Sequence, residues 1–172
     1  ITVPSQDMVL GLYYITKPRP NVKGEGLVFY GPEEAIIAYN EKRAELHATV
    51  KCVVRDVDDN GNEFEELKET TIGRILFNQV VPEEVGYINT VLTKKSLRDI
   101  IAVVLKKAGA DKVAKFLDDI KNMGYRMAFQ GGLSFNLDAV VIPDSKQELV
   151  QEGYAKADAI MDDYNMGLIT NN

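Results

Sequence analysis

The spacing of apolar residues in the first part of the chain predicts short elements separated by a loop. Apolar residues recur at helical spacing in residues 4–16 and favour a short helix there, with a strand as the alternative. Residues 17–26 contain two prolines and two glycines and predict a loop. Residues 27–30 predict a short strand, and Pro32 is expected to start a helix because proline suits the first helical position. The predicted buried face of that helix is Ala35, Ile36, Ala38 and Tyr39.

A β hairpin is predicted in the middle of the chain. Apolar residues alternate with mostly polar ones from Leu46 to Val53, which is the period of a half-buried strand. Asn60-Gly61 is a strong hairpin signal, and residues 64–67 and 69–77 are expected to carry the returning strands. The tip also resembles the first half of a calcium-binding loop, but Leu67 stands where that loop requires a glutamate, so a solvated tip is favoured. The partial match consists of Asp56, Asp58, Asn60 and Gly61.

From residue 93 the pattern predicts two amphipathic helices. The first is expected to start at a capping box of Ser96 and Asp99 and to end at Gly109. The second is expected to end at Gly124. Each helix has one apolar face, so both must lie on a shared core. The predicted buried residues are Leu97, Ile100, Ile101, Val104, Leu105 and Ala108 in the first helix and Val113, Phe116, Leu117 and Ile120 in the second.

A long, protruding helix is predicted near the C-terminal end. After a short extended run at residues 140–143, Ser145 and Glu148 form a capping box that opens a helix of about 20 residues, roughly 30 Å long. A narrow apolar seam suits one partner helix, and the remaining surface is polar and acidic. Residues 166–172 predict a turn with no returning helix after it. We therefore expect half of a truncated coiled-coil hairpin. The seam consists of Leu149, Gly153, Ala157, Ile160 and Tyr164.

Composition and charge narrow the classes of function. The 172 residues fit one domain or two small ones, and a net charge of −6 argues against gripping a phosphate backbone unaided. The single cysteine excludes an internal disulfide and suits a reducing compartment. No apolar run approaches the roughly 20 residues of a membrane span and no signal peptide is evident, so a cytoplasmic location is expected. The chain lacks an initiator methionine and is expected to come from the middle of a longer one.

No set of residues forms a recognisable catalytic or metal-binding site. His47, the only histidine, is expected to have a surface or packing role, and its odd separation from Cys52 points the two to opposite strand faces. One histidine and one cysteine nearly exclude a structural zinc site. The glycines at 24–26 and 131–132 lack the continuations of phosphate-binding fingerprints and predict turns. These residues alone indicate a soluble α+β domain of unspecified role, expected to be part of something larger.

Four stretches, in the same order, resemble the β′ subunit of bacterial RNA polymerase. Residues 3–14 (VPSQDMVLGLYY) are similar to the segment that follows the family's catalytic magnesium-binding loop. Residues 23–26 and 31–35 match the next stretch, and residues 70–74 resemble its "TT-x-GR" turn. Val141-Ile142-Pro143, the acidic helix and the turn after it resemble the first of two helices at the rim of the secondary channel. The resemblance covers essentially the whole chain.

The resemblance implies a non-catalytic part of a nucleotidyltransferase. In that family three β′ aspartates bind magnesium just before the region similar to this chain, and the enzyme works by two-metal phosphoryl transfer. That motif, the bridge helix, the trigger loop and the zinc elements do not occur here. We therefore expect no catalytic residue, no cofactor and no activity in the chain alone, with magnesium and zinc bound elsewhere in the parent subunit. Implied partners are the β, α and ω subunits and, through the parent complex, DNA, nucleotides and the RNA 3′ end, with no membrane.

The resemblance assigns one candidate surface to each end of the chain. Residues 1–143 correspond to the pore (secondary-channel) domain, with Pro4, Ser5, Gln6 and Asp7 expected to line the channel near the active site. The alternative is that Ser5, Gln6 and Asp7 only cap a helix.

Residues 144–172 correspond to the first rim helix, where coiled-coil transcript-cleavage factors and related channel regulators are expected to dock. The acidic face and apolar tip suit a basic partner that offers an apolar contact, and a solubilising surface is the alternative. The candidate docking residues are Asp158, Asp162, Asp163, Met166, Leu168 and Ile169.

Two other hypotheses are a stand-alone adaptor with an acidic coiled-coil arm and a small enzyme with an unrecognised carboxylate site. An adaptor should have a complete helical hairpin and an initiator methionine, and this chain shows neither. A small enzyme should have a cleft with perturbed carboxylates. In some family members the helix after Gly109 helps bind an alarmone nucleotide, but Asp111 stands where a basic residue is expected, so that site is not predicted.

Overall fold

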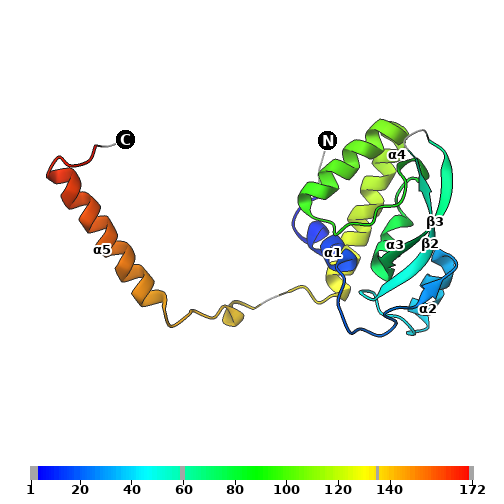
Figure 1. The fold of residues 1–172 in the computed structure, drawn as a ribbon, viewed down its shortest axis with the longest axis horizontal. Coiled ribbons are helices and arrows are strands. Elements are labelled where there is room, and N and C mark those ends of the chain that lie inside the picture. The colour runs from blue at the N-terminus through cyan, green and yellow to red at the C-terminus, as the bar shows by residue number, and fades with distance from the viewer. Residues whose placement is uncertain (1–3, 59–60, 135, 171–172) are drawn as a thin grey trace. The chain divides into compact units, whose positions relative to one another are not determined.

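The computed structural model describes residues 4–58, 61–134 and 136–170, in two compact units that divide after Leu133 (Figure 1). Helices and a small sheet make an α+β fold, which confirms the predicted fold class. The first unit contains α1 (Asp7–Thr16), β1 (Val28–Phe29), α2 (Pro32–Asn40), β2 (Thr49–Val57), β3 (Glu63–Thr71), α3 (Ile72–Asn78), η1 (Glu83–Val85) and α4 (Lys94–Gln130). The second contains η2 (Leu137–Ala139) and α5 (Lys146–Asn165).

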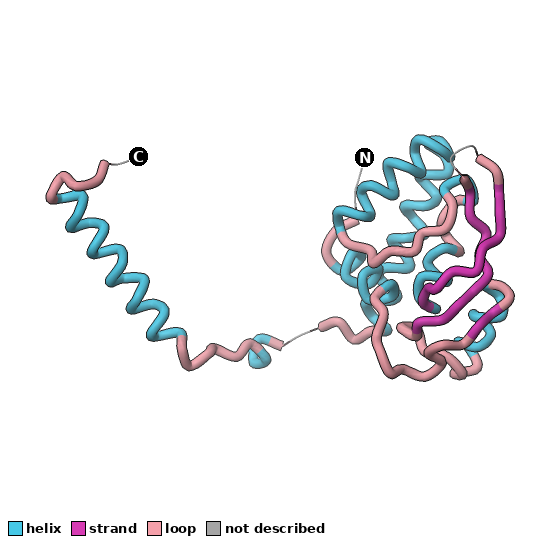
Figure 2. Tube along the Cα trace, viewed as in Figure 1, coloured by secondary structure: helices cyan, strands magenta, loops and turns pink. Residues whose placement is uncertain are grey.

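The three strands form a mixed sheet in the order β1-β2-β3, drawn in magenta in Figure 2. β1 runs parallel to β2, and β2 and β3 form the predicted antiparallel hairpin, with Val54 opposite Glu66. The backbone N–H of Asp58 donates to the carbonyl of Asn62 at 3.0 Å and closes the hairpin. Asn60, which the sequence predicts in the turn, lies outside the described residues.

The returning strand is shorter than the sequence predicts. Residues 69–77 were expected to be extended, but β3 ends at Thr71 and α3 occupies Ile72–Asn78. The hydroxyl of Thr71 accepts a hydrogen bond from the backbone N–H of Arg74 and caps the helix. Ile72 and Ile75 are both fully buried at a spacing of three, so helical packing rather than strand alternation sets the conformation here.

Two clusters of buried residues stabilise the first unit. One lies between the sheet, α2 and α3 and includes Ala48, Val50 and Cys52 from the predicted alternating run, together with Val54, which lies beyond that run. The other joins α1, α3 and α4, where the rings of Phe77 and Phe116 meet edge to face at 6.4 Å. Figure 1 accordingly shows α1 and α4 together on one side of the unit and the sheet on the other, with α3 between them.

α4 contains both predicted amphipathic helices, but two of their predicted boundaries are wrong. A break at Gly109, with φ 84°, confirms the predicted junction. The capping box lies one turn earlier than predicted: Thr93 and Ser96 exchange bonds, while Asp99 takes no part. Gly124 does not end the second helix, which continues to Gln130. Most of the predicted faces are buried, but Ala108 and Leu117 are only partly buried and Leu105 is 38% exposed.

Gly124 is explained by a close approach between α1 and α4. A β carbon added at Gly124 would lie 2.6 Å from the carbonyl oxygen of Met8, and one added at Gly11 would overlap the carbonyl of Gly124. Contact with a neighbouring helix, rather than helix termination, therefore requires glycine at this position.

The second unit is dominated by α5, whose 20 residues match the predicted length. Ser145 is at the N-cap but makes no side-chain capping bond, so the predicted capping box is wrong. The seam residues are exposed, Leu149 by 63% and Ile160 by 59%. Residues 166–170 form the predicted turn, with Gly167 at φ 76°. Among the described residues, no helix combines the length and apolar character that crossing a membrane requires.

Candidate functional site

The candidate channel residues stand at the start of α1. Pro4 is buried, Ser5 is half-buried, and Gln6 and Asp7 are exposed. Gln6 occupies the N-cap with a positive φ of 52°, and no side chain caps the helix there. The structure therefore gives no support to the alternative that these polar side chains cap α1, and it leaves the Gln6 amide and the Asp7 carboxylate facing solvent.

A shallow groove of about 450 Å³ lies beside this end of α1. Leu10 and Tyr13, one and two turns into the helix, are 42% and 36% exposed and form part of its apolar wall. The remaining lining residues are Gln6, Val9, Leu92, Thr93 and Lys94. Polar groups at Gln6 thus adjoin an accessible, mostly apolar surface.

The other end of α1 is held by the residues of the 70–74 stretch. Arg74 donates from Nε to the carbonyl of Thr16 at 3.1 Å and from Nη1 to the Asn89 side chain at 3.0 Å. A guanidinium at a helix C-terminus also favours the negative end of the helix dipole. The Thr16 hydroxyl accepts the N–H of Leu92 at 2.9 Å, which links the helix to the segment before α4.

His47 lies against the same end of α1 and has a packing role. It is 5% exposed, and its ring meets Tyr14 edge to face at 4.6 Å. Its Nδ1 lies 2.8 Å from the carbonyl of Lys17, so Nδ1 carries the hydrogen, while Nε2 finds no partner among the described residues. Burial lowers the pKa of His47 despite that bond, so the ring is neutral near pH 7.

Cys52 is no more suited to nucleophilic chemistry. Burial, with the nearby carboxylates of Glu33 and Glu34, raises the pKa of the thiol to about 11. The reactive thiolate is therefore essentially absent at neutral pH. No group of three His, Cys, Asp or Glu side chains able to hold a metal ion occurs within residues 4–58, 61–134 and 136–170.

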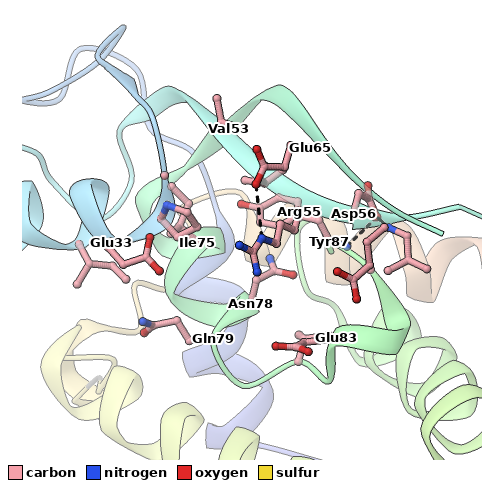
Figure 3. Close-up of a pocket in the computed structure, with 18 of the residues that line it drawn as sticks. Glu33, Val53, Arg55, Asp56, Glu65, Ile75, Asn78, Gln79, Glu83 and Tyr87 are labelled. Atoms are coloured by element: carbon pink, nitrogen blue, oxygen red, sulfur yellow. Dashed lines mark hydrogen bonds and ion pairs between the residues drawn. The ribbon is translucent and has the colours of Figure 1, made fainter. Parts of the chain in front are cut away.

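A larger pocket of about 550 Å³ lies between the hairpin, α2, α3 and η1, as Figure 3 shows. Arg55 and Glu65 form an exposed ion pair on its wall at 3.5 Å. The side-chain amide of Asn78 is occupied by hydrogen bonds within the fold. Its nitrogen donates to the carbonyl of Ile88 and its oxygen accepts the N–H of the same residue, both at 2.8 Å. The side chains of Glu33, Gln79 and Glu83 also line the pocket.

Asp56 is the most strongly held carboxylate in this pocket. Its side chain pairs with Lys68 across the hairpin and accepts the backbone N–H of Tyr87 at 3.0 Å. Burial alone would raise the pKa of Asp56, but the hydrogen bonds from Lys68, Tyr87 and Val57 outweigh it and keep the pKa below 3.8. The pKa of Asp56 is thus perturbed downward, which keeps the carboxylate ionised in a structural role and gives no proton donor of the kind that acid catalysis near neutral pH requires.

The candidate docking residues lie together at the end of α5. Met166 and Leu168 are 66% and 69% exposed, and Ile169 is 41% exposed. Backbone N–H groups of Met166 and Leu168 donate to the carbonyls of Asp162 and Asp163, both at 2.9 Å, so the turn is joined directly to the last turn of α5. Asp158 lies one turn earlier on α5. The docking residues belong to the second unit and the channel residues to the first.

Sequence patterns could not reveal the pocket or the contacts of Arg74. The guanidinium of Arg74 bonds residues 58 and 15 positions away, and the pocket draws its walls from several separate elements. The only sequence signal for Arg74 was its place in the 70–74 stretch.

Comparison with known proteins gives one consistent result. The family described as "RNA polymerase Rpb1, domain 3" matches residues 1–140. Over all 172 residues the chain is 62% identical to the "DNA-directed RNA polymerase subunit beta'" of Bacteroides fragilis and 63% identical to that of Porphyromonas cangingivalis. The corresponding subunit of Flavobacterium psychrophilum is 52% identical, again across the whole chain. The chain spans only 12%, 15% and 12% of the length of these three relatives.

Proposed function

The chain belongs to the RNA polymerase Rpb1 domain 3 family as a segment of a bacterial-type β′ subunit, and we propose that it lines the channel through which nucleotides reach the active site. The observation that carries this proposal is the free start of α1. Gln6 and Asp7 are exposed, Gln6 makes no capping bond, and an open groove adjoins them. Free polar groups at an accessible surface can hydrogen-bond a passing nucleotide or RNA end.

In this proposal the chain supplies no chemistry of its own. Magnesium and zinc of the parent enzyme would be bound outside this chain, because the family's magnesium-binding motif and zinc elements do not occur in its sequence. The chain would act within an assembly of β, α and ω subunits in the cytoplasm, which carries out DNA-templated RNA synthesis. Alone, it is expected to be inactive.

We further propose that the tip of α5 is a docking surface for basic coiled-coil factors that enter the channel. Three acids, Asp158, Asp162 and Asp163, precede the exposed apolar residues of the turn. Opposite charge steers such a partner and fixes its register, while the apolar contact supplies affinity. The stand-alone adaptor is not favoured, because all 172 residues, α5 included, are similar to a stretch that makes up only 12% or 15% of a β′ relative.

The docking proposal is tested by titrating assembled polymerase with a basic coiled-coil cleavage factor at low and moderate salt. Replacing Asp162 and Asp163 by Asn and Leu168 by Ala is expected to weaken binding by about tenfold or more. The charge contribution should shrink as salt rises. Glu148→Gln, at the other end of α5, is the matched control and should bind normally. Unchanged affinity in the triple variant would remove the docking surface and leave the channel proposal standing.

A further inference from the structure

The helix that carries the candidate channel residues is held against α4 by contacts between backbone atoms. A β carbon at Gly11 would overlap the carbonyl of Gly124 and lie 2.8 Å from the backbone nitrogen of Ala128. A β carbon at Gly124 would lie 2.6 Å from the carbonyl oxygen and 2.9 Å from Cα of Met8. Real β carbons essentially never come within 3.0 Å of another heavy atom. Neither glycine can therefore gain a side chain unless α1 moves away from α4.

The C-terminal end of α1 is fixed independently of that contact. Arg74 bonds the carbonyl of Thr16, and the N–H of Leu92 bonds the hydroxyl of the same residue. A β carbon at Gly73 would overlap the carbonyl of Ile15, so α3 also sits directly on this end. Because this end is held, a push against Met8 or Gly11 is expected to tilt α1 about Thr16 rather than to slide the whole helix.

Such a tilt displaces the start of the helix most. At 1.5 Å per residue, Met8 lies about 12 Å from Thr16 and Gln6 about 15 Å, so Gln6 moves slightly farther than the contact at Met8. Restoring an ordinary 3.4 Å separation from 2.6 Å moves the contact by several tenths of an ångström. Gln6 and Asp7 would then shift by on the order of 1 Å, and misplacement of that size can cost up to about 10²-fold in rate.

Resting on the proposed function, we propose that the contact between Gly11 and Gly124 sets where Gln6 and Asp7 stand in the channel. Gly124 is then a positioning residue for nucleotide passage, although it does not touch the nucleotide. Its effect is transmitted through α1, whose far end is held by Arg74 and Gly73.

The first test is nucleotide addition by assembled polymerase that carries Gly124→Ala. The KM for nucleoside triphosphate is expected to rise roughly three- to tenfold, with a smaller change in kcat. Ala114→Ser adds one heavy atom to an exposed position on the same helix and is the matched control, with unchanged KM and kcat expected. An unchanged KM in a Gly124→Ala enzyme that assembles normally would overturn the inference.

The second test asks whether Gly124 acts through the channel residues. Gln6→Ala combined with Asp7→Asn should raise KM, and adding Gly124→Ala to that pair should raise it no further. A rise that is simply the product of the separate effects would overturn the inference but not the proposed function. If Gln6→Ala with Asp7→Asn leaves KM unchanged, both the proposed function and the inference fail.

Arg74→Lys tests the held end of α1 if the Gly124 variant does not assemble. The variant loses the hydrogen bond from Nε to the carbonyl of Thr16 and adds no bulk to the fold. Because α1 is then held less firmly, KM should rise by a smaller factor, and this rise should again be lost in the Gln6 and Asp7 variant. An assembled Arg74→Lys enzyme with unchanged KM would contradict the inference.

Discussion

Single residues of the 70–74 stretch each have a distinct structural task. The hydroxyl of Thr70 donates to the Asn89 side chain at 2.9 Å, and that of Thr71 caps α3. Gly73 allows backbone contact with α1, and Arg74 bonds the end of that helix. The stretch therefore joins the hairpin to α1. It contacts the C-terminal end of α1, whereas the candidate channel residues lie at the other end.

Gly73→Ala is expected to destabilise the chain severely. The added methyl would overlap the carbonyl oxygen of Ile15 and lie 2.8 Å from its carbonyl carbon, and backbone on both sides cannot yield cheaply. We expect a loss of about 3 kcal/mol or more in the free energy of unfolding, measured by urea denaturation. Gly153→Ala, on α5 with nothing within 4 Å, should be neutral or stabilising by up to about 1 kcal/mol. Equal losses of unfolding free energy in the two variants would contradict a close contact between Gly73 and the backbone of Ile15.

His47 is expected to make stability depend on pH just below neutrality. Burial lowers its pKa in the folded chain, and Lys17 and Arg19 nearby add to the effect against the opposing influence of Glu45. The unfolded chain therefore binds the proton first, and stability is complete above the ordinary pKa of 6.5 and falls as pH drops below it. Urea denaturation of wild type and His47→Gln between pH 5 and 7.5 tests this. A pH slope that persists unchanged in the variant would exclude His47 as its source.

At the scale of elements, sequence patterns predicted correctly those features that depend on neighbouring residues in the chain. The length of α5, the hairpin and the break at Gly109 follow from periodicity and turn residues, and the structure has all three. Gly109 and Gly124 were both predicted to stop a helix, yet only Gly109 has a positive φ. Gly124 is required because α1, which is distant in the sequence, packs closely against it. No local sequence pattern predicts such a contact.

The hairpin is expected to depend on the cross-strand ion pair between Lys68 and Asp56. Lys68 and Asp56 have side chains only 23% and 16% exposed, so Lys68→Met would leave a poorly solvated carboxylate without its cation. We expect a loss of about 1–3 kcal/mol in the free energy of unfolding. Arg55→Met breaks the exposed pair with Glu65 and should cost no more than about 1 kcal/mol. Hydrogen exchange of the hairpin amides should show the same order, and the reverse order would contradict this account.

At the scale of the whole molecule, the two candidate surfaces belong to different compact units. The sequence predicted both candidate surfaces, through the resemblance and through the polar and apolar residues at each end of the chain. It could not identify how α1 is held, because Gly11 and Gly124, or Arg74 and Thr16, meet only through the tertiary fold. Family membership is shown by the match to residues 1–140.

The central claim, that the start of α1 lines the channel, is tested most directly by photocrosslinking in assembled polymerase. A backtracked complex would carry a photoreactive nucleotide at the RNA 3′ end, and the crosslinked residues would be mapped. The account predicts crosslinks to residues 4–7 that are lost when the complex is returned to its active register, and none to Asp111 on α4. Crosslinks that fall in β′ but never at residues 4–7, in a complex shown to be backtracked, would contradict it.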